Sequence, residues 1–291
     1  MLSLHTNNAA LSAQSSISKT QSTLSTSMTR LSTGYRINSA MDDAAGLQIA
    51  TRLKAQTSGM TVAMSNTQNS TSMLQTAMGA FNEVTNMLVR MKDLATQAAD
   101  VSSSANDKTA MQAEYNALGS ELFNVMTNTT FGGTKLLGNG VAAANGTLSA
   151  AMTFQIGADA SETMSVNLVA GMTGLNAALV SATANFSSAA AAGASELTNS
   201  ANATITLLSN AIASVSTVNS ALGAAANRLD HINNNLSNIS SNTKAASGRI
   251  MDVDFATESS SMTASQMLLQ AGTAMLKQSN SMSSMVMSLL Q

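Results

Sequence analysis

The sequence predicts a mainly α-helical protein in which long antiparallel coiled-coil helices carry a small β-hairpin insert and the two terminal helices pack together. Three observations lead to this fold. Apolar residues recur at intervals of seven through both halves of the 291-residue chain, which is the spacing of helices that wrap around each other. The chain has no proline, so no helix is forced to break. Only one central stretch alternates apolar and polar side chains as a strand does.

The two ends of the chain are long amphipathic segments with almost no charge. Residues 1–29 and 259–291 each carry one formal charge, Lys19 and Lys277 respectively. The ends of a soluble monomer usually fray in water, so ends this long and neutral suggest a surface that a partner covers. The expected seam residues are Leu4, Leu11, Ile17, Leu24 and Leu31 before a helix end at Gly34, and Leu268, Met275, Met282 and Leu289 beside a row of Met262, Leu269 and Leu276.

Between the ends, heptad patterns predict two long helices. Ser39, with Asp42 three residues later, is expected to cap a helix of about 60 residues that ends near residues 102–106. A third helix is expected over residues 107–129, and a second long helix from Glu196 to a break near Gly248. The coiled-coil positions are Leu53, Met60, Leu74, Phe81 and Leu88 in the first long helix, and Leu208, Val215, Leu222, Leu229 and Leu236 in the second.

The middle of the chain is predicted to hold the β-hairpin. Residues 152–156 and 164–169 alternate apolar and polar side chains on either side of a loop at 157–161. Gly132 and Gly133 indicate a turn. Residues 171–199 are rich in small residues, and we expect a short variable connector there that is irregular or forms a short helix plus loop.

Composition excludes several classes of function. The net charge is −2 with 10% charged residues, so the basic footprint of a nucleic-acid-binding protein is absent. The lack of cysteine excludes disulfides, thiolate metal sites and a cysteine nucleophile. The N-terminus does not resemble a cleaved signal peptide. The sequence also lacks a run of about 18 apolar residues, which a membrane-spanning helix would need. The 21 methionines are expected to fill gaps in a core that has few aromatic residues.

Candidate catalytic and metal-binding residues are few. His5 and His231 are far apart in sequence, whereas a zinc site or a catalytic triad needs further ligands or partners. The acidic pair at residues 42 and 43 is expected to cap a helix, and the pair at residues 252 and 254 to form a turn, rather than to bind a cation. The sequence therefore predicts no cofactor, no metal and no enzymatic activity.

Several motifs, in matching order at both ends, resemble bacterial flagellin. The segments LSTGYRINSAMDDAAG at 31–46 and LVRMKDLATQ at 88–97 are similar to the N-terminal signature of that family. The segments RIMDVDFATE at 249–258, LQAGT at 269–273 and SLL at 288–290 are similar to its C-terminal signature, and FQIG at 154–157 fits its hairpin. The resemblance covers residues 1–170 and 200–291.

The resemblance implies a structural subunit that is exported unfolded through the flagellar type III channel and polymerises under a cap into the extracellular filament used for swimming or swarming. Residues 1–33 with 256–291 would form the inner D0 domain, and residues 34–170 with 200–255 the surrounding D1 domain. The connector at 171–199 would replace the outer domains, which makes this a minimal flagellin.

The resemblance also implies partners. These are further copies of the chain, the flagellar cap, the hook-associated proteins and an export chaperone. Arg90, Leu94, Gln97 and Glu114 fall on the segment that host Toll-like receptor 5 recognises in the family, and Arg90 and Leu94 are expected to share one helix face. Both chain ends are predicted to be disordered in the monomer and to become helical on assembly.

Two other functions stay open at this point. A hook–filament junction protein shares the terminal helices, although the motifs at 42–46 and 269–273 favour flagellin. A secreted coiled-coil translocator would need a hydrophobic hairpin that inserts into membranes, and the sequence lacks one.

Overall fold

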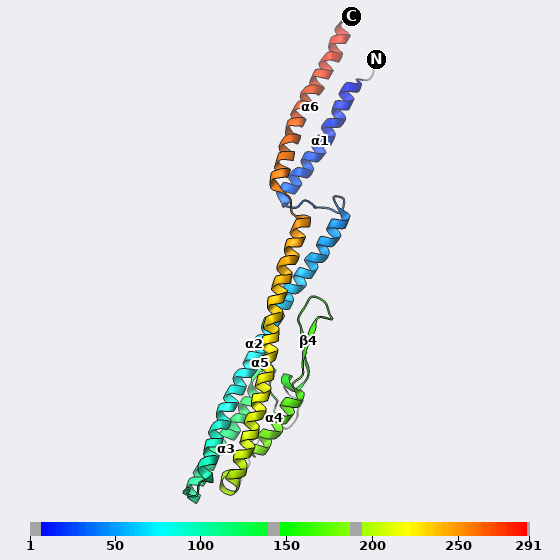
Figure 1. Ribbon diagram of the computed structural model, residues 1–291. Helices are drawn as coiled ribbons and strands as arrows, with labels where there is room; N and C mark the ends of the chain where they lie inside the picture. The colour runs from blue at the N-terminus through cyan, green and yellow to red at the C-terminus, as the bar shows by residue number, and fades with distance from the viewer. Residues whose placement is uncertain (1–6, 139–145, 187–193, 290–291) are drawn as a thin grey trace. The chain divides into compact units, whose positions relative to one another are not determined.

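The computed structural model describes residues 7–138, 146–186 and 194–289, and Figure 1 draws their helices and strands. Long helices dominate these residues, which confirms the predicted fold class. The described chain forms two compact units. The terminal unit contains the residues up to Thr57 and from Ser241 onward, and the central unit contains Ser58–Ser240. Leu4 and His5 lie outside the described residues.

The terminal unit contains the first and last helices, α1 (Asn8–Thr33) and α6 (Phe255–Leu289), which lie side by side (Figure 1). α1 begins where the Asn7 side chain accepts a hydrogen bond from a first-turn backbone N–H (3.1 Å). It ends at Gly34, whose φ of +75° is left-handed and whose N–H donates to the carbonyl of Arg30 (2.9 Å). The predicted glycine end of this helix is therefore confirmed.

The predicted start of the next helix at Ser39 is wrong. α2 spans Ala44–Ala99, and its cap is Asp43, whose Oδ1 accepts from the backbone N–H three residues later (2.8 Å). The neighbouring Asp42 turns the other way, because its Oδ2 accepts from the backbone N–H groups of Asn38 (3.1 Å) and Ser39 (2.9 Å). One acid of the pair caps the helix and the other closes the loop in front of it.

The central unit is built around one hydrophobic core. It is shared by α2, α3 (Ala105–Asn128), α4 (Val169–Ala182) and α5 (Glu196–Met251). α5 runs through the predicted break at Gly248, so that prediction is wrong. Of the expected coiled-coil positions, Leu53 is half-buried in the terminal unit, Met60 and Leu236 belong to a small separate cluster, and the following are fully buried in the core: Leu74, Phe81, Leu88, Leu208, Val215, Leu222 and Leu229.

Two antiparallel hairpins occur in the described part of the chain. β1 (Thr130–Phe131) and β2 (Thr134–Lys135) are joined by the two predicted turn glycines, both at positive φ. β3 (Met152–Gln155) and β4 (Thr163–Val166) form the predicted hairpin. A short 3-10 turn at Thr147–Ser149 precedes β3. The inward-pointing side chains of β3 and β4 join the core of the central unit, which explains the alternating pattern in the sequence.

The segment expected to be a variable connector contributes to this core. Its first part forms α4, the short helix of one of the two expected alternatives, and residues 187–193 lie outside the described residues. Leu175 and Leu179 of α4 are fully buried. Phe186, which follows the helix, packs edge-on against Phe123 of α3 with ring centroids 5.7 Å apart. The segment therefore stabilises the central unit as well as linking its two halves.

Polar side chains fasten the start of α5 to α3. The side chain of Gln112 accepts from the backbone N–H of Leu197 (2.7 Å) and donates to Glu196 (2.8 Å). Nearby, the hydroxyl of Tyr115 donates to the carbonyl of Ala182 (2.6 Å). Burial, with a smaller effect of the Glu196 charge, raises the pKa of Tyr115, so the hydroxyl stays protonated and keeps donating. These bonds satisfy polar groups that the core would otherwise leave unpaired.

Candidate functional site

The candidate site is the surface of the two terminal helices, because apolar side chains gather there without cover. α6 carries two apolar rows with different surroundings. Met262, Leu269 and Leu276 are half-buried. The second row, Leu268, Met275 and Met282, is 62%, 69% and 58% exposed. We call this second set the exposed row.

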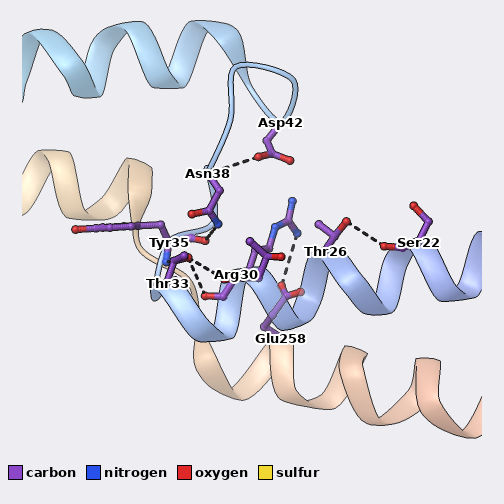
Figure 2. Close-up of polar contacts among 9 residues, drawn as sticks. Ser22, Thr26, Arg30, Thr33, Tyr35, Asn38, Asp42 and Glu258 are labelled. Atoms are coloured by element: carbon purple, nitrogen blue, oxygen red, sulfur yellow. Dashed lines mark hydrogen bonds and ion pairs between the residues drawn. The ribbon is translucent and has the colours of Figure 1, made fainter.

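Contacts along the α1–α6 seam explain why one row is covered. Near one end, the Arg30 guanidinium lies 3.7 Å from the Glu258 carboxylate, as Figure 2 shows. Farther along, a Cβ on Gly272 would lie 2.9 Å from Ile17, so the helices approach closely there. Glu258 and Gly272 are fourteen residues apart, and Met262, Leu269 and Leu276 form a second heptad row four residues farther along, so both rows lie on the same side of α6.

The seam buries little apolar surface. The buried residue of α1 is Ser27, at 3% exposure, and in α6 Ser265 is buried at 7%. Small side chains at these positions let the two backbones approach. Because few apolar atoms leave water, the pair by itself gains little hydrophobic stabilisation.

The threonines of α1 satisfy their own hydroxyl groups. Thr26, for example, donates to the carbonyl of Ser22 (3.1 Å), and Thr33 donates to that of Thr29 (2.9 Å); Figure 2 draws the first of these bonds. Burying a hydroxyl costs free energy when it loses its partner, and these hydroxyls carry their partner within the helix. α1 can therefore be covered by another protein surface without losing these bonds. The same bond is made by Thr20, Thr23, Thr26, Thr29 and Thr33.

The two connectors that flank the helix pair are tied together. Tyr35 and Asp252 form an isolated antiparallel bridge, and Val253 donates its N–H to the carbonyl of Gly34 (3.0 Å). The Tyr35 backbone also donates to the Thr33 hydroxyl (3.2 Å; Figure 2). These bonds place the end of α1 beside the start of α6. α1 and α6 therefore lie side by side from this point onward.

The structure divides the predicted terminal residues into two kinds. In α1, Ile17, Leu24 and Leu31 are half-buried, whereas Leu11 is 66% exposed. In α6, the predicted Leu268, Met275 and Met282 are the exposed row. The side chain of Leu289 lies outside the described residues, as does Leu4. Further exposed side chains that the sequence reasoning did not single out as site residues are Met28, Met267 and Met285.

The residues expected to face a receptor do not share one exposed surface. Arg90 forms an ion pair with Glu114, with Nη2 and Oε1 2.7 Å apart, and both side chains are about half exposed. Gln97 is exposed. Leu94 is 2% exposed and belongs to the core of the central unit. Arg90 and Leu94 are four residues apart on α2, but Leu94 is buried, so the two side chains do not form one accessible surface in this structure.

Titratable groups do not gather into a metal site within the described residues, where no group of three or more metal-ligating side chains occurs. His231 is exposed on α5. The Thr257 hydroxyl, together with the backbone N–H groups of Ala256 and Thr257, lowers the pKa of Asp254. This is the behaviour of a carboxylate that caps a helix start, here that of α6.

One helix of the described chain, α5, contains a stretch that is long and apolar enough to cross a membrane by length and composition, with a mean hydropathy of 1.3. The stretch is not an uninterrupted run of about 18 apolar residues, because serine, threonine and asparagine interrupt it. Core helices of soluble proteins pass the same test, and the heptad leucines of α5 are buried in the central unit.

Comparison with known proteins gives matches along most of the chain. Residues 4–142 match the bacterial flagellin N-terminal helical region, and residues 205–290 match the bacterial flagellin C-terminal helical region. Flagellin A of Vibrio anguillarum is 33% identical over 389 aligned residues, covering 100% of both chains. Flagellin C of Vibrio cholerae is 32% identical over 382 residues, covering 99% of both.

Two further similarities cover part of the chain. Polar flagellin F of Vibrio parahaemolyticus is 47% identical over 167 residues, which is 57% of this chain and 42% of that protein. The crystal structure of Bacillus cereus flagellin is similar with a TM-score of 0.47 and 30% identity, over 59% of this chain and 88% of that one.

The alignment with the Vibrio anguillarum protein also shows that this chain is shorter. Its 389 aligned positions exceed the 291 residues of this chain by 98, so at least 98 aligned positions have no counterpart here. The two family regions leave residues 143–204 of this chain unmatched.

Proposed function

We propose how this chain assembles, since it belongs to the bacterial flagellin family and is a structural subunit of the flagellar filament used for motility. The subunit polymerises through the exposed row of α6 and the exposed side chains of Leu11 and Met28 on α1. Its domains are D0 and D1 only. The observation that carries the proposal is the exposed apolar row of α6, which lies on a pair of helices with very few charged residues. Such a surface is typical of a site that another protein covers.

The chemistry of the terminal helices suits burial in an assembly. The exposed row supplies apolar area, and the threonine hydroxyls already have partners within α1. The two helices carry few charges, so many copies can crowd about one axis with little repulsion. We infer that the contact joins different patches on successive copies, since such contacts do not close and build helical filaments.

Seeded growth tests this function. Purified subunit moved to high salt with sheared filament seeds should elongate the seeds into filaments of micrometre length, because salt screens the remaining charges and favours apolar burial. Electron microscopy measures the length. Subunits that stay monomeric with fresh seeds would contradict the proposal.

We propose that D0 consists of α1 and α6 and that D1 consists of the helices and hairpins between them. The connectors that pair at Tyr35 and Asp252 support this boundary, because α1 ends just before Tyr35 and α6 begins shortly after Asp252. The terminal unit of the structure extends farther, to Thr57 and Ser241, since it also includes the first part of α2 and the last part of α5.

We expect α1 and α6 to be disordered in the free subunit and ordered in the filament. The seam buries mainly small side chains such as Ser27 and Ser265, and fixing a residue costs roughly 1–2 kcal/mol of backbone entropy alone. Hydrogen exchange measured by mass spectrometry should be fast for residues 8–33 and 255–289 in the monomer and slow in the filament. Residues 74–98 of α2 serve as the control and should be protected in both. Slow exchange and protease resistance of both ends in dilute monomer would refute the expectation.

The family supplies further partners as proposals. We propose that the chain is exported by the flagellar type III route, held by an export chaperone, and added beneath a cap next to hook-associated proteins. The low stability expected of the free terminal helices supports this, because an exported chain must pass a narrow channel without stable structure.

Recognition by Toll-like receptor 5 is likewise a proposal. Arg90, Gln97 and Glu114 are accessible, whereas Leu94 supports the core. We expect Arg90→Ala to lower receptor activation in reporter cells by about tenfold, the size of one lost charged contact. Val89→Ala, on the same exposed stretch, should change it little. Equal activation by wild type and Arg90→Ala would exclude Arg90 from recognition.

A further inference from the structure

The methionines of this chain fall into two environments. In the central unit, Met91, Met126 and Met164 are 0%, 0% and 2% exposed. On the terminal helices Met262 is half-buried, whereas five other methionines are 56–69% exposed: Met28, Met267, Met275, Met282 and Met285. Two of these five, Met275 and Met282, belong to the exposed row proposed above for assembly, so their sulfur atoms would lie at the contact between copies.

We propose that this surface is a site of reversible oxidation, in which a peroxide converts Met275 and Met282 of the free subunit to sulfoxides and thereby stops the subunit from joining a filament. The inference rests on the proposed assembly function. It adds a modification that acts on the same surface.

The oxidation step needs only the peroxide, and its reversal needs methionine sulfoxide reductases with a thiol reductant. A lone pair of the thioether sulfur attacks one peroxide oxygen, so that the S–O bond forms while the O–O bond breaks. The sulfur loses two electrons and becomes a sulfoxide. The other oxygen takes the electron pair and a proton and leaves as water. Susceptibility follows exposure, so Met275 and Met282 should react before Met91 and Met126, whose side chains are buried.

The product is unsuited to an apolar contact. A sulfoxide replaces a flexible apolar group by a polar and chiral one. Its oxygen accepts hydrogen bonds from water in the free subunit and would lose them at an apolar seam. The neighbouring Leu268 of the exposed row is unaffected, so the row would keep its shape and lose its apolar character at two of three positions.

Accessibility does not depend on whether the terminal helices are folded in the monomer. In the structure the two sulfur-bearing side chains are 69% and 58% exposed, and a disordered chain exposes them more. In a filament built through this row they would be covered. Oxidation should therefore act before incorporation, and assembled subunits should be protected.

The test compares peroxide-treated and untreated subunit on the same seeds. Dilute subunit is treated with hydrogen peroxide, the peroxide is destroyed with catalase, and sulfoxides are located by mass spectrometry. We expect sulfoxides at Met275 and Met282 and a rise of about tenfold or more in the critical concentration for growth. Methionine sulfoxide reductases should restore growth, and preformed filaments should be oxidised more slowly at both positions.

Matched variants separate this site from other methionines. Met275→Leu combined with Met282→Leu conserves volume and apolar character, so it should grow normally before treatment and retain growth after it. Met41→Leu removes a methionine that is 96% exposed in the loop before α2 and should stay as sensitive as wild type. Oxidised wild type that grows like untreated protein, or a double variant that loses growth equally, would overturn the inference. Untreated subunit that fails to grow would refute the assembly function itself, before any peroxide is added.

Discussion

We expect filament growth from seeds to be lost when Leu268 and Met275 are both replaced by Asp. Each side chain is exposed in the single subunit, at 62% and 69%, and would be covered by a neighbouring copy in the filament. Burial of a side chain of this size stabilises a contact by about 1.5–3 kcal/mol. Since about 1.4 kcal/mol corresponds to a tenfold change in affinity, losing both should raise the critical concentration by a factor on the order of a hundred to ten thousand.

The aspartates add a second cost. A carboxylate at an apolar contact loses its water without gaining a partner. The measurement is the subunit concentration left in solution after seeded growth reaches its plateau, with filament length counted by electron microscopy. The central unit contains neither residue, so the urea unfolding of the double variant should match that of wild type.

The control places the same charges on the other flank of α6. Thr263 and Gln270 are exposed and seven residues apart, as Leu268 and Met275 are, and that flank is polar. Thr263→Asp with Gln270→Asp introduces the same number of aspartates into the same helix and should affect growth far less. Equal loss in both double variants would show that charge alone prevents growth and that the exposed row has no special part in the contact.

Phe81→Ala is expected to destabilise the central unit by about 3–5 kcal/mol, the range for removing a fully buried aromatic side chain. Phe81 is 0% exposed and lies on the heptad stripe of α2 between Leu74 and Leu88. The chain has few other aromatic residues. The core therefore has few large side chains that could move into the cavity left by the substitution. A loss of this size is a large fraction of the 5–15 kcal/mol that is typical of a folded domain.

Urea unfolding followed by circular dichroism measures this loss as a lower midpoint with a similar slope. Val89→Ala is the matched control, since Val89 lies on the same helix and is 45% exposed; we expect a change within about 0.5 kcal/mol there. A midpoint for Phe81→Ala within error of wild type would show that the α2 stripe is not the structural centre of the unit.

Much of the fold could be predicted from local patterns. The left-handed glycine that ends α1, the start of α5 at Glu196 and the hairpin of β3 and β4 all lie where the sequence indicated. Each depends on residues that are close in the chain, through a backbone conformation, a helix period or a strand alternation. The start of α2 was misplaced because Ser39 and Asp43 are both good caps. Which of them is used depends on how Asp42 closes the loop.

The candidate site was only partly predictable. The heptad spacing identified both apolar rows of α6, but spacing alone does not say which row faces α1. The close approach at Gly272 and the ion pair of Arg30 with Glu258 decide it, and both join residues more than 200 positions apart. In the same way, Leu94 looks accessible beside Arg90 in the sequence, and the packing of the central unit turns it inward.

The amino-acid sequence by itself determined the helices, their approximate ends, the neutral character of both termini and the family. The helices and the neutral termini follow from composition and from periodicities along the chain, which neighbouring residues set, whereas the family follows from the motifs at both ends that resemble it. Only the tertiary structure decided which apolar faces are used within the subunit and which are left for other copies. The heptad pattern of α6 contains two apolar rows, and the contacts with α1 at Gly272 and Glu258 decide which of them is covered within the subunit.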